Sequence, residues 1–422
     1  MDKMADVLGR AGAWCGQNKY LSAIKNAFQN FMPLTIAGAI GVLWCNVLVN
    51  DQTGLGLFFK PIMALDFLNP AFQAVNFCTI SCITVGITLG IAQEIGVWNM
   101  GAEKAGYIPG LVGLAAWLSV TNTSHMVEGA KEAFTGIAGN ELGATGLFTG
   151  MIIGVLSVEL FCFFEKQDAL KIKMPEQVPP GVARAFEVLV PATITLIITA
   201  CIGSACYNLT GLYLNDVIKN GIQGPLGAVG ATIPGVMIIY LVIMLFWLVG
   251  IHGNNMLSAV KEALFTPLAL ENVEKFNKGE KPTNIINMYA LQMWGEFGGS
   301  GVTIGLVIAI MIFGKREDNK AIASLSLVPG LFNINETVTF GIPMVLNPIL
   351  GIPFVVAPLI TIIIGYVLTV IGFCPVACLT VPWTCPPLIF GFLATGANIM
   401  GAVTQAILIV VSTVIYVPFL IA

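Results

Sequence analysis

A carboxylate and two amides stand close together in the second half of the chain, where they interrupt apolar sequence. Asn333, Asn335 and Glu336 lie between Pro329 and Gly341, two residue types that break helices. The three side chains offer amide donors, amide acceptors and a negative charge, which is the mixture that sugar hydroxyls require. Transporters build their substrate sites from broken helices with polar side chains at membrane depth. The alternative for Glu336 is a carboxylate paired structurally with another residue.

A histidine follows a second strongly apolar run. His252 comes five residues after Trp247 and is followed by Gly253 and Asn254. It is one of only two histidines in the chain. The glycines at 250 and 253 lie on either side of it, which indicates an interrupted helix. A histidine at a helix end is often only structural, but this context favours a role in binding or catalysis. We therefore include Trp247, His252, Gly253 and Asn254 among the expected substrate-binding residues.

A third irregular segment places a tryptophan among prolines. Trp383 lies in the sequence PWTCPP at 382–387. Such a tryptophan either anchors the protein at the membrane interface or stacks on the apolar face of a sugar ring, and both interpretations stay open. Three cysteines at 374, 378 and 385 have no histidine near them, so we expect no metal site, and no cofactor either.

Acidic residues in apolar sequence need an explanation, because an acidic side chain at the bilayer centre costs roughly 2.5–3.5 kcal/mol. Four lie in or beside apolar runs: Glu94, Glu159, Glu296 and Glu336. Glu94 and Glu159 lie near the ends of their runs, where snorkelling or a local hydrogen bond explains them. The glycine-rich sequence at 298–303 lacks the lysine of a phosphate-binding loop. It predicts close approach of the backbone between helices.

The composition indicates which elements position these residues. Of 422 residues, 56% are apolar and 10% are charged, against about 25% charged in a soluble protein. Together with a mean hydropathy of +0.87, this predicts an all-α polytopic membrane protein, with the lipid bilayer as its surroundings. The apolar runs are too long for a β-barrel. No basic stripe predicts binding to nucleic acid.

About ten apolar runs are long enough to cross a bilayer. They are 31–50, 71–93, 106–122, 144–164, 187–207, 229–251, 297–314, 322–346, 349–372 and 399–421. Lys and Arg gather before the first run and after the fourth, which predicts a cytoplasmic N-terminus. Two segments, 3–30 and 165–190, mix charged and apolar residues and suit amphipathic helices on the cytoplasmic surface.

The second half of the chain conflicts with a simple count of crossings. The basic clusters at 275–281 and 315–320 should both be cytoplasmic, but one clear crossing, 297–314, separates them. Either residues 284–296 cross as well, or part of 252–296 is a re-entrant hairpin. Re-entrant backbone is tolerated only beside protein or a water-filled cavity, so the conflict predicts a cavity in this half.

Six stretches together resemble one family of transporters. They are MPLTIAGA at 32–39, KMPEQVPPGVARAF at 173–186, GIHG at 250–253, GGSGVTIGL at 298–306, INETVTFGIPMVLNPILGIPF at 334–354 and VPWTCPP at 381–387. This combination resembles the phosphotransferase-system (PTS) enzyme IIC permeases, in the branch for lactose, cellobiose and N,N′-diacetylchitobiose. The resemblance spans nearly the whole chain.

The resemblance implies a homodimeric, multi-pass sugar carrier of the bacterial inner membrane, with ten transmembrane helices and two re-entrant hairpins in the C-terminal half. It implies three regions with different roles. Residues 1–165 would form a scaffold and dimerisation region, 166–190 an interfacial linker, and 191–422 the sugar-binding transport domain. The linker would act as the hinge when the transport domain moves.

For the site, the resemblance implies that Glu336 contacts the sugar hydroxyl to be phosphorylated, with His252 nearby. Asn333 and Asn335 would add polar contacts, and Trp383 would be a stacking platform. Glu336 would orient the attacking hydroxyl or weakly accept its proton. The chain itself would not be an enzyme, because the phosphoryl group would come from separate IIB and IIA proteins.

The predicted function is therefore that of a PTS enzyme IIC permease. It would bind a β-linked disaccharide such as N,N′-diacetylchitobiose or cellobiose and carry it across the inner membrane for phosphorylation by IIB. Two alternatives belong to other classes. One is a proton-coupled symporter for a sugar or small solute, with Glu336 and His252 as the proton relay, and the other is a passive channel.

Overall fold

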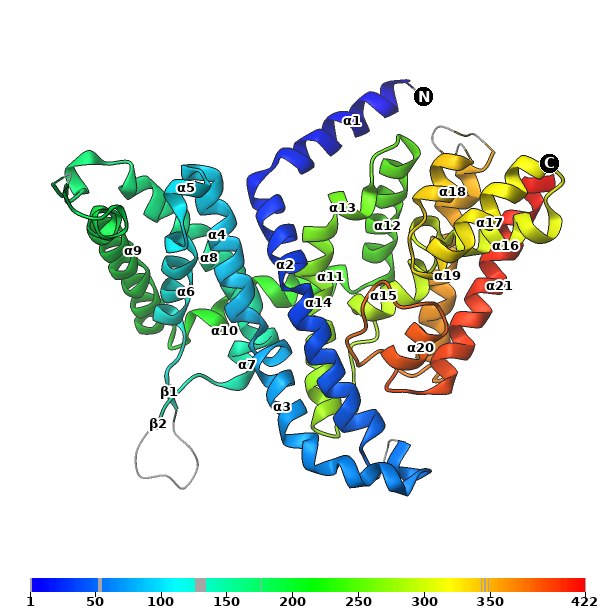
Figure 1. The fold of residues 1–422 in the computed structure, drawn as a ribbon, viewed down its shortest axis with the longest axis horizontal. Helices are drawn as coiled ribbons and strands as arrows, with labels where there is room; N and C mark the ends of the chain where they lie inside the picture. Colours follow the sequence, from blue (N-terminus) through cyan, green and yellow to red (C-terminus); the bar gives the residue numbers. More distant parts are fainter. Residues whose placement is uncertain are drawn as a thin grey trace. The chain divides into compact units, whose positions relative to one another are not determined.

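The computed structural model describes residues 2–51, 55–125, 134–175, 177–342, 344, 347 and 349–421. Positions 343, 345, 346 and 348 of the stretch at 334–354 therefore lie outside the described residues. Almost all regular structure in the described part is helical (Figure 1). Its strands are one antiparallel pair of two residues each, β1 (Ser124–His125) and β2 (Phe134–Thr135). The prediction of an all-α protein is confirmed.

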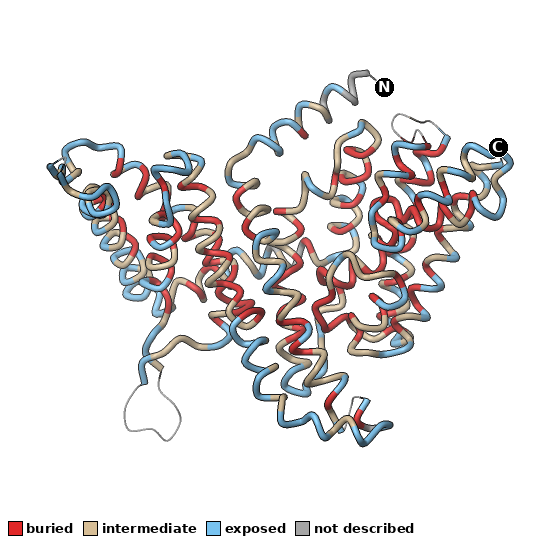
Figure 2. Tube along the Cα trace, viewed as in Figure 1, coloured by how far each residue is buried: buried red, intermediate tan, exposed pale blue. Residues whose placement is uncertain are grey.

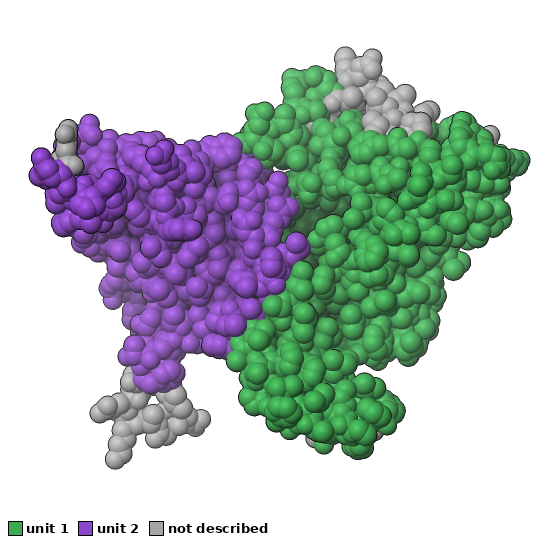
Figure 3. Space-filling view, viewed as in Figure 1, with its two compact units in different colours: residues 1–17, 36–76, 227–422 green, residues 18–35, 77–226 purple. Residues whose placement is uncertain are grey.

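The chain divides into two compact units (Figure 3). Unit 1 consists of Met1–Gln17, Ile36–Asn76 and Gly227–Ala422, and unit 2 of Asn18–Thr35 and Phe77–Leu226. The units follow from packing alone. The division by role into scaffold, linker and transport domain stays a prediction.

Unit 2 contains four long helices and several short ones. They are η4 (Ile80–Cys82), α4 (Ile83–Met100), α5 (Ala102–Ala105), α6 (Ile108–Val120), α7 (Gly139–Leu142), α8 (Ala144–Glu165), η5 (Asp168–Leu170), α9 (Pro180–Thr210), α10 (Leu214–Ile218) and η6 (Lys219–Gln223). Three further helices contain residues of both units: α2 (Lys19–Leu43), α3 (Asn69–Cys78) and α11 (Gly224–Gly230).

Small residues bring α4, α6 and α8 close together at the centre of unit 2. A Cβ atom at Gly113 of α6 would lie 2.3 Å from the Cβ of Ala92 in α4. One at Gly150 of α8 would lie 2.2 Å from the hydroxyl of Thr88. Buried residues accordingly run along α4 and α8, whereas α9 is mostly exposed (Figure 2). Small residues at helix interfaces are typical of membrane proteins.

Two of the acids in apolar sequence have local partners in unit 2, as predicted. The amide of Asn26 donates to Glu94 at 2.9 Å, and the ammonium of Lys19 lies 2.6 Å from Glu159. A third acid, Glu165, ends α8 with its side chain only 1% exposed, and it pairs with Lys104 at 2.8 Å and Arg184 at 3.0 Å. Arg184 lies in the first turns of α9, so this pair joins the ends of two long helices.

Unit 1 carries the remaining helices. They are α1 (Asp2–Gln17), η1 (Trp44–Leu48), η2 (Leu55–Leu57), η3 (Lys60–Leu68), α12 (Ile233–Leu248), α13 (Gly253–Met256), α14 (Ser258–Asn277), α15 (Met288–Gly295), η7 (Ser300–Val302), α16 (Ile304–Phe313), α17 (Glu317–Leu331), α18 (Glu336–Gly341), α19 (Gly351–Val370), α20 (Ile389–Ala394) and α21 (Ile399–Ile421).

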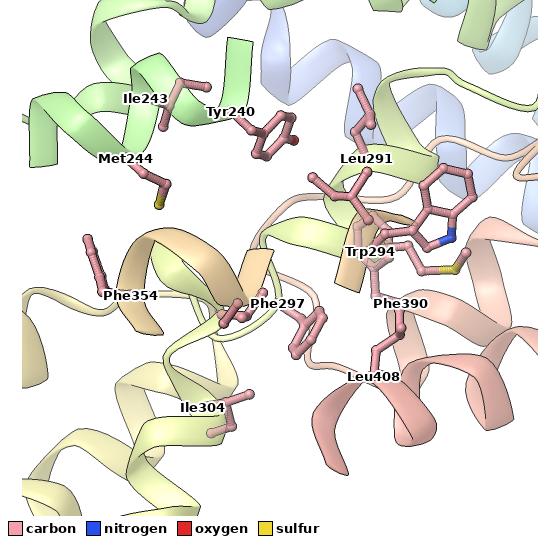
Figure 4. Close-up of a cluster of buried hydrophobic side chains, with 14 of the residues drawn as sticks. Tyr240, Ile243, Met244, Leu291, Trp294, Phe297, Ile304, Phe354, Phe390 and Leu408 are labelled. Carbon is pink, nitrogen blue, oxygen red and sulfur yellow. The ribbon is translucent and has the colours of Figure 1, made fainter. Parts of the chain in front are cut away.

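The core of unit 1 forms around the short helix α15. Figure 4 shows Leu291 and Trp294 of α15 in one cluster with side chains from α12, α16, α19, α20 and α21. Glycine allows a close contact here, because a Cβ at Gly365 of α19 would lie 2.3 Å from the indole of Trp294. This core holds the irregular segments that carry the predicted site.

Six segments of the described chain are long and apolar enough to cross a membrane. They are Lys19–Leu48, Lys60–Met100, Ala144–Glu165, Pro180–Thr210, Gly351–Val370 and Ile399–Ile421. A seventh is counted if Met288–Val302 and Ile304–Phe313, bent by 57° at their junction, form one span. The prediction of a multi-pass membrane protein is supported, and the number ten stays a prediction.

Several predicted segments have different boundaries in the structure. The segment 3–30 contains the end of α1 at Gln17 and the start of α2 at Lys19, which continues to Leu43 as an apolar helix. In the segment 165–190, residues 171–175 and 177–179 are irregular, and α9 begins at Pro180. Within the predicted crossing over 322–346, the described residues form the last part of α17 and, after a turn, α18.

The structure also bears on the two explanations for the conflict between the basic clusters. Within 284–296 the helix is α15, which has eight residues. At 1.5 Å per residue it is about 12 Å long, whereas the hydrocarbon core is about 30 Å thick. The helix α15 alone is therefore too short to cross the bilayer. Together with α16 it forms a pair of helices bent by 57°, which fits a broken span as well as a re-entrant loop, so both explanations stay predictions.

Candidate functional site

The predicted pair His252 and Glu336 comes together in unit 1. His252 caps the start of α13, and Glu336 is the first residue of α18. The imidazole Nε2 lies 3.7 Å from Oε1 of Glu336, and the two side chains are 36% and 46% exposed. This distance exceeds that of a hydrogen bond, so the two groups face each other without a direct bond.

A local hydrogen bond determines which ring nitrogen of His252 carries the proton. The backbone N–H of Asn255 donates to Nδ1 at 3.3 Å. Nδ1 is therefore the acceptor, and a neutral imidazole carries its proton on Nε2. Opposite this donor lies the carboxylate, which only accepts when it is ionised. The gap between them is thus bordered by one donor and one acceptor.

Trp247 and Gly253 position the side chain of His252 by packing. The indole of Trp247 is 1% exposed, and its ring centroid lies 4.4 Å from that of His252. A Cβ at Gly253 would lie 2.0 Å from the carbonyl oxygen of Ile243, so only glycine allows this turn to pack on α12. Both residues are close to the site, but their surfaces are covered by protein.

Asn333 connects three irregular segments. Its Oδ1 accepts from the backbone N–H of Gly298 at 2.6 Å, and its Nδ2 donates to the carbonyl oxygens of Trp383 and Cys385. Asn333 has a φ of +62°, a left-handed conformation that asparagine tolerates better than most residues. Its amide is therefore engaged with backbone groups of the protein.

Asn335 packs the turn before Glu336 against the glycine-rich loop. Its Nδ2 donates to the carbonyl oxygen of Ser300 at 2.8 Å and to Thr339 at 3.2 Å, and the residue is 3% exposed. A Cβ at Gly299, which has a φ of +88°, would lie 2.7 Å from the Cβ of Asn335. The prediction that the glycines at 298–303 allow close approach is confirmed.

Trp383 differs from Trp247 because its side chain is 44% exposed. Its backbone carbonyl accepts a hydrogen bond from Asn333. The exposed indole is free to contact a ligand or the membrane interface. Within the part of the chain that the structure describes, no group of three or more His, Cys, Asp or Glu side chains is arranged to hold a metal ion.

Lys261 lies beside this site and was not predicted from the sequence, whereas its partner Asn254 was. Asn254 donates to the hydroxyl of Ser300 at 2.9 Å and accepts from Lys261 at 3.3 Å. Lys261 in turn pairs with Glu296. The sequence identified Glu296 as an acid beside an apolar run but did not indicate its partner. The charged sequence SAVKEA around Lys261 is typical of a solvated helix, so no local signal distinguishes this lysine.

Comparison with known proteins identifies the family. Residues 25–358 match the family model of the phosphotransferase system EIIC. The chain is 33% identical to the PTS system oligo-beta-mannoside-specific EIIC component of Bacillus subtilis (strain 168), over 99% of this chain and 93% of that protein. It is 30% identical to the PTS system cellobiose-specific EIIC component of Lactococcus lactis subsp. lactis (strain IL1403), over 99% and 97%.

A solved structure agrees with this assignment. The crystal structure of the transporter ChbC, the IIC component from the N,N′-diacetylchitobiose-specific phosphotransferase system, superimposes with a TM-score of 0.88. The two chains are 30% identical, and the match covers 97% of this chain and 94% of that one. EIIC components are the membrane transport subunits that work with IIA and IIB partners. The chain therefore belongs to the EIIC family, as a multi-pass sugar permease of the phosphotransferase system.

Proposed function

We propose that this permease carries a β-linked disaccharide, with cellobiose or N,N′-diacetylchitobiose as the first sugars to test. The relatives named for oligo-beta-mannoside, cellobiose and N,N′-diacetylchitobiose take sugars joined by β-linkages. They match nearly the whole length of this chain. The shared chemistry of their substrates is the support for this class, and the identity of the sugar is left to binding measurements.

The observation that carries the proposed site is the gap between His252 and Glu336. A sugar hydroxyl placed beside both atoms can accept a hydrogen bond from Nε2–H of His252 and donate one to the carboxylate of Glu336. Because the two atoms are 3.7 Å apart, one oxygen at their side reaches both at about 2.6–3.2 Å. This arrangement aims the hydroxyl's proton at Glu336. The hydroxyl oxygen is then oriented to attack the phosphoryl group that IIB supplies.

The other predicted residues divide by their exposure. Trp383 is the residue we expect to stack on a sugar ring, because its indole is uncovered. The amides of Asn333 and Asn335 are engaged in hydrogen bonds within the protein, so we expect them to shape the site rather than to contact the sugar directly. We expect the same positioning role for Trp247, which lies under the imidazole. Gly253 and Asn254 complete the turn that holds His252.

Isothermal calorimetry on the detergent-purified protein tests the substrate class. We expect one of cellobiose, N,N′-diacetylchitobiose and lactose to bind, and glucose to bind weakly or not at all. Failure of all three disaccharides to bind would contradict the proposed class.

Uptake of the sugar into vesicles then distinguishes transport coupled to phosphorylation from transport coupled to protons. We expect it to require phosphorylated IIB and to ignore a protonophore, whereas a symporter that uses Glu336 and His252 would show the reverse.

We also propose the orientation, the regions and the dimer. The N-terminus would be cytoplasmic, because four basic residues precede the first apolar run at 31–50: Lys3, Arg10, Lys19 and Lys25. Residues 1–165 would form the scaffold and dimerisation region, 166–190 the linker, and 191–422 the transport domain. The exposed apolar surface of α9 would be covered by lipid or by a second copy. Cysteine accessibility at the N-terminus and native mass spectrometry test the orientation and the dimer.

A further inference from the structure

A buried ion pair lies beside the proposed sugar site in unit 1. Lys261 comes from α14 and Glu296 follows the last residue of α15, and their side chains are 7% and 16% exposed. The ammonium contacts Oε1 of Glu296 directly. The hydroxyl of Tyr240, a fully buried residue of α12, donates to the same oxygen at 2.6 Å. Three helices of unit 1 therefore meet at this carboxylate.

The lysine extends this contact toward the histidine. Its ammonium donates a second hydrogen bond, of 3.3 Å, to Oδ1 of Asn254. Asn254 stands two residues after His252, in the short helix α13. An ammonium has no acceptor, so the oxygen of the Asn254 amide must face Lys261. The cation therefore determines which way round this amide lies.

The orientation of the Asn254 amide determines the next contact. With Oδ1 turned to Lys261, Nδ2 faces Ser300 and donates to its hydroxyl at 2.9 Å. The carbonyl of the same Ser300 accepts from Asn335 at 2.8 Å, and Asn335 directly precedes Glu336. A continuous chain of polar contacts thus runs from the turn of His252 to the turn of Glu336. Lys261 determines the direction of the first hydrogen bonds in this chain, because it orients the amide of Asn254.

The energetics argue against a purely stabilising role for this pair. Removing two charges from water costs several kcal/mol per ion, and the attraction between them often only balances this cost. Apolar residues of similar volume would fill the same space at no such cost. A buried pair that also fixes an amide beside a ligand site is better explained by the geometry that it imposes.

We propose that Lys261 and Glu296 are a positioning pair for the sugar site. Glu296, held by Tyr240, places the ammonium of Lys261. Lys261 then orients Asn254, which sets the spacing between His252 and Glu336. This inference rests on the proposed function of that pair as the site of the sugar hydroxyl, and it adds no residue that touches the sugar.

A cycle of three variants tests the pair, with the Kd for the disaccharide measured by calorimetry on folded protein. In Glu296→Gln the amide oxygen still accepts from Tyr240 and Lys261, so Asn254 stays oriented and the Kd should rise less than about threefold. In Lys261→Met the orienting donor is lost, and the Kd should rise by about tenfold or more. The double variant, Lys261→Met with Glu296→Gln, should bind as weakly as Lys261→Met.

The alternative of a purely structural ion pair makes the opposite prediction. If the pair only balances charge, each single variant leaves one buried charge without a partner, and the double variant restores wild-type affinity. Restoration in the double variant would overturn the proposal. Phe265→Leu is the matched control, because Phe265 is a fully buried apolar residue one turn after Lys261. It should lower Tm without changing the Kd.

Asn254→Ala keeps the test valid if a charge variant fails to fold. It removes the oriented amide and leaves both charges in place, so the Kd should again rise by about tenfold. Wild-type affinity in this variant would also overturn the proposal. The proposed function fails separately, because in that case the wild-type protein itself binds no disaccharide.

Discussion

The carboxylate of Glu336 is the single group on which the proposed chemistry depends most. Glutamine is nearly the same size and removes only the charge, so we expect Glu336→Gln to fold normally and to lose most phosphorylating uptake. Uptake of labelled disaccharide into vesicles supplied with IIA and IIB measures this loss. Glu94→Gln is the control, since Glu94 is a membrane acid held by Asn26 in unit 2. Wild-type uptake by folded Glu336→Gln would contradict the role of Glu336.

The exposed indole of Trp383 should contribute directly to sugar binding. Trp383 is 44% exposed, and loss of its stacking in Trp383→Ala should weaken sugar binding by about 1–2 kcal/mol. Trp383→Phe should retain most of the affinity because it keeps an aromatic face. Trp98, 58% exposed on α4, provides the control, and Trp98→Ala should leave the Kd unchanged. Equal affinity of Trp383→Ala and wild type would instead favour an interfacial anchor.

The residues that could be predicted from sequence were those that are rare in apolar surroundings. His252 and Glu336 stood out for that reason, and the structure places them 3.7 Å apart although 84 positions separate them. The burial of Trp247 could not be predicted, because it depends on packing against Phe340 and Phe354. Lys261 was missed because its partner Glu296 is 35 positions away, and the local sequence resembles an exposed helix.

At the scale of elements, the turn between α12 and α13 depends on one glycine. In Gly253→Ala the new methyl group would lie 2.0 Å from the carbonyl oxygen of Ile243, so the turn must move. We expect a loss of about 1–3 kcal/mol of stability and weaker sugar binding, because His252 moves with the turn. Thermal unfolding and calorimetry measure the two effects. Gly9→Ala, inside α1 with open space around it, should raise stability by about 0.5–1 kcal/mol and leave sugar binding unchanged, and an unaltered Gly253→Ala would refute this account of the turn.

The junction of α8 and α9 depends on the buried carboxylate of Glu165. Glu165→Ala removes the shared partner of Lys104 and Arg184, but Lys104 is 46% exposed and Arg184 keeps Glu187 at 2.8 Å, so we expect a loss of about 1–3 kcal/mol. We expect a lower Tm and easier proteolysis between Lys171 and Pro179. Asp318→Ala, which removes an exposed partner of Arg316, should have little effect. A Glu165→Ala protein as stable as wild type would show that the cations are satisfied without it.

The boundaries of helices could be predicted where an apolar run is uninterrupted, but not where polar residues interrupt it. The long apolar runs at 144–164 and 399–421 appear as α8 and α21 almost unchanged. The run at 322–346 contains Asn333 and Asn335, which bond to backbone groups of other segments, and it is divided into α17 and α18. Such tertiary hydrogen bonds leave no periodic signal in the sequence.

At the scale of the whole molecule, the composition alone predicted a membrane protein, because 10% charged residues cannot cover a soluble surface. It could not predict the two compact units. Each unit takes stretches from separate parts of the chain: residues 36–76 pack with the C-terminal half, and residues 18–35 pack with 77–226. Hydropathy reports where a helix lies in lipid and carries no information about which helices pack together.

The most direct test of the central claim is a structure of the protein with its β-linked disaccharide bound. We predict one sugar hydroxyl oxygen within about 2.6–3.2 Å of both Nε2 of His252 and a carboxylate oxygen of Glu336. The indole of Trp383 should lie against a sugar ring. A sugar bound away from these two residues, or with no hydroxyl between them, would contradict the proposed site.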